Sequence, residues 1–458
     1  MTYPPPTKNI SVIGLGKLGA PLAACLASKG HRVIGVDLNP QTVRLVNECR
    51  APVFEPGLEE LLRANRGRLV ATDDYQAAIA GSEVTFIVLP TPSDEHGGFS
   101  LRYVLGACAR IGEALRNKAD YHLIVLTSTV LPGATSNQVK PVLEDRSGKR
   151  CGPDFGLCFS PEFIALGSVI RDLLYPDFIL IGESDPHSGD MLVGIYKNLC
   201  DSDPPIARMN FVNAELTKLA INTFVTTKIS YANMLTQVCE RIPGADVDVV
   251  TSALGLDSRI GRKYLKGAIG YGGPCFPRDN LAFTYLTRTL GTHAILAEAT
   301  DQVNRQQVPR LAELVLSKLP GGGRVAILGL SYKPKSDVVE RSQGLELAQY
   351  LLAQDISVVL YDPVAMDNAR FVLGDRASFA SSAEECTRQA NVVVVTTPWE
   401  EFRDLSPKHL NYSNGRPTLV DCWRILDRQR FEQDADYFVL GAGPSIDRQN
   451  TEAVVNLP

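Results

Sequence analysis

The 458-residue sequence lacks a long apolar run and lacks an excess of basic charge. Its longest largely apolar stretches, such as 84–89 and 392–395, are far shorter than the ~20 residues that a membrane-spanning helix needs. Lys and Arg number 46 against 51 Asp and Glu, which gives a formal net charge of −5. This mildly acidic balance argues against nucleic acid or an anionic membrane surface as the main partner.

Cysteine and histidine lack the spacing of a metal site. The ten cysteines include no CxxC pair, and the six histidines are scattered along the chain. The first eight residues carry three prolines and no basic segment ahead of an apolar one, so no secretory signal is visible. We therefore expect no metal, mostly buried reduced thiols and a cytoplasmic location.

The N-terminal segment reads as one complete β-α-β unit. An apolar strand leads into a glycine turn, a helix over 20–29 and a second strand over 31–37. The turn matches GxGxxG at Gly14, Gly16 and Gly19, a pattern typical of dinucleotide binding when it joins a strand to a helix. Asp37 ends the second strand, where a carboxylate can accept both ribose hydroxyls and favours NAD over NADP. The alternative is a tight turn with no ligand.

The chain then repeats this organisation. Strands at 84–90 and 123–127 extend a parallel sheet, a linker-like stretch spans 201–205, and a long helix is expected over 213–241. From Gly323 the opening pattern returns: a strand at 324–328, Gly329, a helix at 343–354 and a strand at 356–361. Only Gly329 of the three glycines is visible there, and Lys333 falls where a helix would cradle pyrophosphate, so we expect a ligand other than a dinucleotide. The predicted fold is α/β, with two Rossmann-like doubly wound domains joined by a long central helix; the domains are 1–205, 206–315 and 316–458.

A glycine- and proline-rich loop at 270–279 surrounds Cys275. A thiol in such a loop, with Arg278 nearby to favour the thiolate, is a candidate nucleophile, and the alternative is a small buried side chain. Asp279 is either a general base or the N-cap of the helix that follows.

Polar residues recur along one side of the long helix at spacings of three, four, four and seven: Glu215, Lys218, Asn222, Thr226 and Asn233. This stripe faces either solvent or a site. In a site, Lys218 and Asn222 supply donors that stabilise an oxyanion. At two strand exits, Ser128 and Thr129 follow one strand, and Glu162 follows the next as a possible base or a surface-turn residue.

Seven motifs in order resemble the UDP-glucose/GDP-mannose dehydrogenase family over essentially the whole chain. They are GLGKLG at 14–19, LPTP at 89–92, STV at 128–130, SPEF at 160–163, ELTKLAIN at 215–222, YGGPCFPRD at 271–279 and GLSYKPKSD at 329–337. Within the family, the RIG segment at 259–261 and the CFPRD loop are most similar to the UDP-glucose branch.

The resemblance implies NAD-dependent, four-electron oxidation of a nucleotide-sugar C6 alcohol to a carboxylate. Lys218, Asp279 and Thr129, with water, take the hydroxyl proton; Lys218 and Asn222 stabilise the oxyanion. Cys275 forms a thioester, and Glu162 activates the water that hydrolyses it. The implied NAD contacts are Gly14, Gly16, Lys17, Leu18, Gly19, Asp37, Pro90, Thr91, Ser128, Thr129 and Arg278. The implied substrate contacts are Phe163, Ile164, Lys218, Asn222, Arg259, Tyr264, Lys266, Tyr271, Gly272, Tyr332, Lys333 and Arg424.

The resemblance also implies a UDP-sugar substrate and a homodimer built on the central helix, with a larger assembly left open. Arg259 matches a residue that reaches the neighbouring subunit's substrate. Three departures from the family pattern bear on substrate identity: Leu166 replaces a Glu, Arg278 replaces a Lys, and Glu340 stands where an Arg is usual, with Arg341 one place later. The nearest alternatives are a UDP-N-acetylhexosamine or GDP-mannose dehydrogenase; a two-electron 6-phosphogluconate-like hydroxyacid dehydrogenase is more remote.

Overall fold

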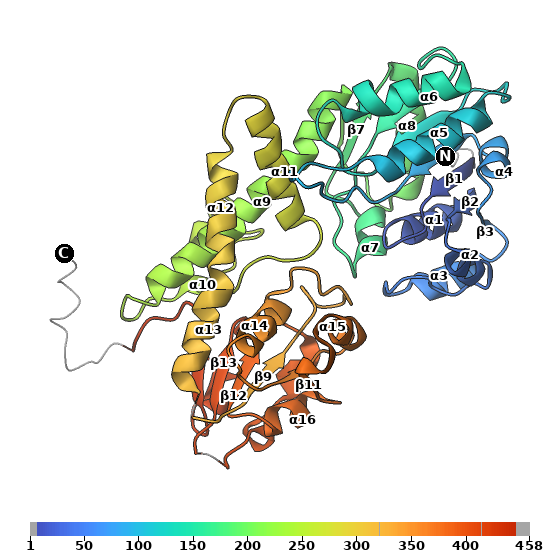
Figure 1. The fold of residues 1–458 in the computed structure, drawn as a ribbon. Helices are drawn as coiled ribbons and strands as arrows, with labels where there is room; N and C mark the ends of the chain where they lie inside the picture. Colours follow the sequence, from blue (N-terminus) through green and yellow to red (C-terminus); the bar gives the residue numbers. More distant parts are fainter. Residues whose placement is uncertain (1–6, 320, 414, 446–458) are drawn as a thin grey trace. The chain divides into compact units, whose positions relative to one another are not determined.

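The computed structural model describes residues 7–319, 321–413 and 415–445. These residues form two compact units, and the boundary falls inside helix α9 (Phe211–Cys239), between Ala220 and Ile221. Figure 1 shows each unit as helices packed on a sheet. No helix formed by the described residues is both long enough and apolar enough to cross a membrane.

The N-terminal unit contains an eight-stranded sheet in the order β3-β2-β1-β4-β5-β6-β7-β8 among its described residues. The strands are β1 (Asn9–Ile13), β2 (Arg32–Val36), β3 (Leu69–Thr72), β4 (Val84–Ile87), β5 (Leu123–Leu126), β6 (Gly156–Phe159), β7 (Ile179–Glu183) and β8 (Ile206–Met209). The first six have the Rossmann order. β6 and β7 pair antiparallel, which the sequence analysis did not predict, whereas the other described pairs are parallel.

Helices cover both faces of this sheet. They are α1 (Gly19–Ser28), α2 (Pro40–Asn47), α3 (Leu58–Ala64), α4 (Tyr75–Ala80), α5 (Arg102–Leu115), the π-helical η1 (Thr135–Val139), α6 (Lys140–Ser147), α7 (Val169–Leu174) and α8 (Pro186–Leu199). β4 and β5 are buried along their whole length because their apolar residues contact helices on both sides. The carboxyl ends of these strands are thereby left as the ligand-binding edge of the sheet.

The C-terminal unit repeats the strand order of the first in a parallel six-stranded sheet, β11-β10-β9-β12-β13-β14, among its described residues. The strands are β9 (Val325–Leu328), β10 (Val358–Tyr361), β11 (Ser378–Phe379), β12 (Val392–Val395), β13 (Thr418–Asp421) and β14 (Asp436–Val439). The helices are α10 (Val247–Leu254), α11 (Phe276–Thr289), α12 (Ile295–Arg305), α13 (Gln307–Lys318), α14 (Gln343–Leu352), α15 (Met366–Leu373), α16 (Ala383–Arg388) and α17 (Arg428–Phe431). The predicted internal repeat is therefore a repeat of topology.

The predicted fold class is confirmed: two Rossmann-like sheets are joined through the 29-residue helix α9. Its bounds lie two residues before the predicted 213–241 at each end. The division into three domains, 1–205, 206–315 and 316–458, stays a prediction, because the structure divides the chain into two compact units and not into three.

Candidate active site

The turn between β1 and α1 has a structural reason for glycine at each of its three glycine positions. Gly14 has φ +93°, and a Cβ there would lie 2.4 Å from the Val88 carbonyl oxygen. A Cβ on Gly19 would lie 1.8 Å from the Gly14 carbonyl oxygen, so helix and turn touch at that point. A Cβ on Gly16 would meet no protein atom within 4 Å. Gly14 and Gly19 are thus required by packing, and Gly16 leaves the backbone open to a ligand.

Asp37 follows β2 and supports the same turn. Its Oδ2 accepts a hydrogen bond from the Leu15 amide at 2.9 Å, and its Oδ1 accepts one from the Asn39 amide at 2.8 Å. The residue is only partly buried, so further lone pairs remain for ribose hydroxyls. Lys17 and Leu18 are both half-buried beside this turn. These residues fit NAD, since the open Gly16 and the carboxylate stand where pyrophosphate and ribose bind.

The second Rossmann-like copy keeps more of this turn than the sequence analysis predicted. Gly329 has φ +105°, and a Cβ on Gly344 would lie 2.1 Å from the Gly329 carbonyl oxygen, as Gly19 does with Gly14. The prediction that only one glycine survives is therefore wrong, because a long insertion separates the pair. The insertion also places Lys333 ten residues before the helix, since α14 begins at Gln343, so Lys333 is not at a helix N-terminus.

Asp362 occupies the position of Asp37 in this copy, but protein donors already bind its carboxylate. Its Oδ2 accepts from the Leu330 amide at 2.8 Å, the Ser331 amide at 2.9 Å and the Trp399 indole at 3.1 Å. The residue is 1% exposed. A ribose hydroxyl therefore cannot reach this carboxylate.

The loops after β4 and β5 are tied together in the N-terminal unit. Ser128 Oγ donates to the Leu89 carbonyl at 2.7 Å, and Thr91 Oγ1 donates to the Thr129 carbonyl at 2.7 Å. Thr91 and Ser128 are buried, Thr129 is half-buried, and Pro90 is exposed. The predicted NAD residues of these two loops therefore form one connected rim at the carboxyl edge of the sheet.

Glu162 and Lys218 meet in the same unit. Lys218 Nζ donates to the Glu162 carbonyl at 2.6 Å and lies 4.4 Å from the centre of the Phe163 ring. Ile164, the next predicted substrate residue, is half-buried beside them. Desolvation raises the pKa of Glu162 to about 7, against the opposing effects of the Tyr196 hydroxyl and the Lys218 charge. Glu162 is therefore suited to gain and lose a proton near neutral pH, unlike a surface-turn carboxylate.

Glu215 joins α9 to the loop that carries Thr129. Its carboxylate is fully buried and accepts from the Gly133 amide at 2.6 Å and the Thr135 amide at 2.8 Å. The polar stripe of α9 is thus buried from its first member, and the solvent alternative is wrong. Its other members, Lys218, Asn222, Thr226 and Asn233, are at most 8% exposed.

Cys275 lies in the C-terminal unit at the N-cap position of α11. It is exposed, whereas seven of the other nine cysteines, all among the described residues, are buried. The N-terminus of this 14-residue helix favours a thiolate at Cys275. The alternative of a buried packing cysteine is therefore wrong.

Asp279 lies in the first turn of α11 and is fully buried. Asn222 Nδ2 donates to its Oδ2 at 2.6 Å, and the Arg278 guanidinium donates to its Oδ1 at 3.0 and 2.9 Å. Because α11 begins at Phe276, the alternative that Asp279 is its N-cap is wrong. The charge of Arg278 is directed at Asp279.

Three asparagines hold the cysteine loop. Asn233 bonds the Ile269 carbonyl at 2.9 Å and the Ala268 amide at 3.0 Å. Asn304 accepts from the Tyr271 amide at 2.7 Å, and Asn280 donates to the Tyr271 hydroxyl at 2.7 Å. The sequence analysis missed Asn304. A signal was present: with Ala297 and Thr300 it forms the buried face of α12, where a polar residue requires a partner.

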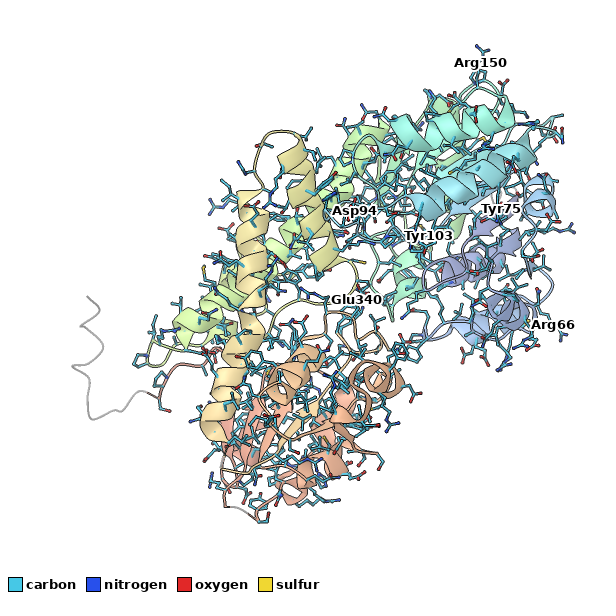
Figure 2. The ribbon with its side chains drawn as sticks, in the orientation of Figure 1. Arg66, Tyr75, Asp94, Tyr103, Arg150 and Glu340 are labelled. Carbon is cyan, nitrogen blue, oxygen red and sulfur yellow. The ribbon has the colours of Figure 1, made fainter. Side chains whose placement is uncertain are left out.

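The loop before α14 packs on the cysteine loop in the same unit. A Cβ on Gly273 would lie 2.6 Å from the Tyr332 ring, and one on Gly272 would lie 2.1 Å from the Arg341 carbonyl oxygen. The Gly273 amide donates to the carbonyl of Glu340, labelled in Figure 2, at 3.0 Å. Lys333 Nζ lies 5.8 Å from the centre of the Tyr332 ring. The structure thus brings the predicted substrate residues Gly272, Tyr332 and Lys333 together.

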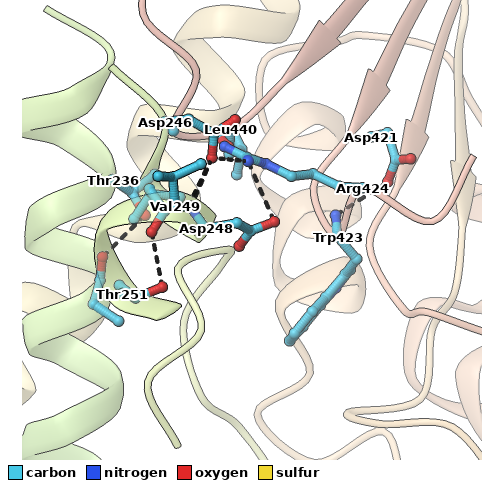
Figure 3. A network of polar contacts seen from close by, with 12 residues as sticks. Thr236, Asp246, Asp248, Val249, Thr251, Asp421, Trp423, Arg424 and Leu440 are labelled. Atoms are coloured by element: carbon cyan, nitrogen blue, oxygen red, sulfur yellow. Dashed lines mark hydrogen bonds and ion pairs between the residues drawn. The ribbon is translucent and has the colours of Figure 1, made fainter. Parts of the chain in front are cut away.

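Four other predicted substrate residues lie in this unit, and one of them, Tyr264, contacts the cysteine loop. Arg259 is exposed and bonds Asp257 in a bidentate pair, Lys266 is exposed, and Tyr264 packs edge-on against Phe276. Arg424 donates to Asp246 at 2.6 Å and to the Leu440 carbonyl, and contacts Asp248 at 3.2 Å, as Figure 3 shows. These ion pairs occupy Arg424, so a phosphate contact by this residue stays a prediction.

The three parts of the chain match one family in order. Residues 8–200 match the UDP-glucose/GDP-mannose dehydrogenase family NAD binding domain, residues 212–306 its central domain and residues 326–428 its UDP binding domain. The chain belongs to this family. The resemblance inferred from the seven motifs and the NAD cofactor are both confirmed, and the chain is an NAD-dependent nucleotide-sugar 6-dehydrogenase.

Two curated relatives and one solved structure are similar over most of their length. UDP-glucose 6-dehydrogenase AglM of Haloferax volcanii is 38% identical over 426 residues, covering 92% of this chain and 98% of the relative. GDP-mannose 6-dehydrogenase of Pseudomonas syringae pv. tomato is 37% identical over 418 residues, covering 87% of this chain and 93% of the relative. The UDP-glucose dehydrogenase structure from Pyrobaculum islandicum has a TM-score of 0.87 at 35% identity, covering 96% of this chain and 99% of that one.

Proposed function

We propose that this family member oxidises UDP-glucose to UDP-glucuronate through a thioester on Cys275. The observation that carries the covalent step is the exposed thiol at the N-terminus of α11, in a loop fixed by buried asparagines. The relatives named for UDP-glucose, which match this chain over nearly its whole length, support the sugar. The UDP binding domain supports a uridine nucleotide.

NAD, when bound, accepts a hydride from the sugar C6 in each of two oxidations. Gly14, Gly16 and Gly19 would hold its pyrophosphate, and Asp37 its ribose. Lys17, Leu18, Pro90, Thr91, Ser128, Thr129 and Arg278 are proposed to contact it.

In the first oxidation the C6 hydroxyl loses its proton while a C–H bond at C6 breaks, and the product is an aldehyde. Lys218, Asp279 and Thr129 with a water molecule are proposed to receive that proton. Lys218 and Asn222 are one turn apart on α9, so both can donate to the same oxygen as negative charge develops on it.

In the second oxidation the Cys275 thiolate adds to the aldehyde carbon, and loss of the C–H bond gives a thioester. Water then attacks the thioester carbon, Glu162 takes the water proton, and the C–S bond breaks to return the thiolate. The covalent link retains the reactive aldehyde between the two oxidations. The proposed nucleotide-sugar contacts are Phe163, Ile164, Lys218, Asn222, Tyr264, Lys266, Tyr271, Gly272, Tyr332, Lys333 and Arg424, with Arg259 acting on a neighbouring subunit's substrate.

GDP-mannose is the second candidate substrate. The observation that favours it is the 37% identity to a GDP-mannose 6-dehydrogenase. The departures at Leu166, Arg278 and Glu340 from the usual family residues leave room for a different sugar pocket. UDP-N-acetylhexosamine relatives share the fold at 24% identity.

The NADH yield at completion tests both the mechanism and the sugar. With limiting UDP-glucose and excess NAD, we expect two NADH per sugar and a carboxylate product by mass spectrometry, and no NADH from GDP-mannose or UDP-N-acetylmannosamine. One NADH with an aldehyde product would contradict the four-electron mechanism. Turnover of GDP-mannose in place of UDP-glucose would change the substrate and leave the mechanism intact.

We also propose a homodimer through α9. In the C-terminal unit, Phe224, Tyr231, Met234 and Val238 are 66%, 46%, 42% and 45% exposed, and their spacings of seven, three and four place them on one side of the helix. Four large apolar residues in one stripe favour burial by a second copy of this chain.

Charge substitution on this stripe tests the dimer. The double variant Phe224→Asp and Tyr231→Glu is expected to be monomeric by light scattering, because burying two unpaired carboxylates is unfavourable. Phe371→Asp is the matched control, since Phe371 is 92% exposed on α15, away from α9 in sequence. A wild-type protein that is monomeric at micromolar concentration would refute the proposal.

A further inference from the structure

A chain of buried hydroxyls leads away from Glu162 in the N-terminal unit. The Tyr196 hydroxyl, on α8, lies 3.2 Å from Glu162 Oε1. Ser160 Oγ, just after β6, lies 2.8 Å from the Tyr196 hydroxyl and donates to the Leu180 carbonyl on β7 at 2.9 Å. Tyr196 is 3% exposed and Ser160 is 1% exposed. Four groups on three segments, namely the loop after β6, α8 and β7, therefore form one line of hydrogen bonds that ends at a carbonyl.

The hydrogen bonds of this line can run in either of two directions, depending on whether Glu162 is ionised or protonated. When Glu162 is ionised, Tyr196 donates to it and Ser160 donates to the Tyr196 oxygen or to Leu180. When Glu162 carries a proton, it can donate to the Tyr196 oxygen, Tyr196 to Ser160, and Ser160 to the Leu180 carbonyl. Only hydroxyl protons turn between the two arrangements, and no heavy atom needs to move. A buried acid normally leaves a group unpaired in one of its states, and that costs stability.

We propose that Tyr196 and Ser160 are positioning residues for thioester hydrolysis, forming a reversible hydrogen-bond line that pairs the Glu162 carboxyl before and after it takes a proton from water. This inference rests on the proposed role of Glu162 as the base. In that step the water oxygen bonds to the thioester carbon, the water proton goes to Glu162 and the Cys275 thiolate leaves. The line reverses as the proton arrives, so the base is held in one rotamer throughout the step.

The titratable groups that interact electrostatically with Glu162 are Tyr196, Lys218, Cys25 and Cys200. Lys218 lowers the pKa of the carboxyl. Burial raises the pKa of Cys25 to about 12 and that of Cys200 to about 11, and it raises the pKa of Tyr196 well above its usual value. These two thiols and the phenol therefore keep their protons between pH 6 and 9. Glu162 alone of these four acids titrates in that interval.

Two substitutions with opposite expected effects test the line. Tyr196→Phe keeps the ring packing and removes the donor to ionised Glu162, so we expect the pKa for hydrolysis to rise. A rise of about one unit from about 7 lowers the hydrolysis rate at pH 7 about fivefold and leaves the rate at pH 9 nearly unchanged. Ser160→Ala removes the acceptor that Tyr196 needs when Glu162 is protonated, so we expect the pKa to fall.

The measurement is single-turnover hydrolysis of the acyl-enzyme from pH 6 to 9, with UDP-glucose and NAD, followed by intact-protein mass and by product quench. Tyr121→Phe is the matched control; Tyr121 bonds Ser188 at 3.1 Å in the same unit and takes no part in the proposed line. We expect the rate of the NADH burst and the Kd for UDP-glucose to be unchanged in Tyr196→Phe, with more acyl-enzyme at pH 7.

The outcomes separate this inference from the function on which it rests. A Tyr196→Phe profile that coincides with wild type, a loss that is equal at every pH, or shifts of the same sign in both variants would overturn the line. Glu162→Gln is expected to accumulate acyl-enzyme at every pH. If Glu162→Gln hydrolyses like wild type, the proposed base is wrong, and if wild type forms no acyl-enzyme, the proposed thioester is wrong.

Discussion

Replacing Cys275 by alanine is expected to lower turnover by about 10³-fold or more and to eliminate the carboxylate product. The reason is chemical: without the thiol, the aldehyde has no nucleophile with which to form the thioester that the second oxidation requires. The NADH yield per UDP-glucose should fall from two to one or less, because the remaining step is reversible. NADH absorbance at completion and the product mass measure both effects.

The control for this variant is Cys151→Ala, since Cys151 is half-buried in the N-terminal unit and has no place in the proposed reaction. It should retain wild-type turnover and yield. Folding of the Cys275→Ala protein should also be unaffected, because the side chain is exposed. If Cys275→Ala still releases a carboxylate with two NADH, the thiol is not the nucleophile.

The regular parts of the fold were accessible from the sequence because they repeat local patterns. A buried strand, a turn and a helix recur after Gly323, and the two sheets share one strand order. The antiparallel pairing of β6 with β7 was not accessible. The direction of that pairing depends on how 160–178 crosses the sheet, and no local residue preference encodes the crossing.

The candidate site shows the same division. Cys275 and the glycine turn carry a local signature, so they could be identified before the structure. Gly344 and Gly329 lie fifteen residues apart, and only the approach of a Cβ to a carbonyl oxygen reveals them as a pair. Asn304 and Tyr196 are similar cases, because each acts through hydrogen bonds to residues far away in sequence.

The glycine turn yields the second large effect, in the variant Gly16→Ala. A Cβ at this position meets no protein atom within 4 Å, so the fold should tolerate it. The same methyl group would enter the space that the pyrophosphate needs, and overpacking of this kind costs about 1–3 kcal/mol. We expect the KM for NAD to rise about 10- to 100-fold, measured by initial rates, with an unchanged Tm.

Gly19→Ala is the control for this prediction, because its added methyl group would clash with the protein itself and not with the ligand. Its Cβ would lie 1.8 Å from the Gly14 carbonyl oxygen, so α1 must move away from the turn. We expect the free energy of unfolding of the N-terminal unit to fall by about 3 kcal/mol, seen as a lower Tm. If Gly16→Ala lowers Tm as much as Gly19→Ala does, the open space at Gly16 is not a ligand site. If instead the Tm of Gly16→Ala is unchanged and its KM for NAD is raised, the turn divides its glycines between packing and cofactor binding.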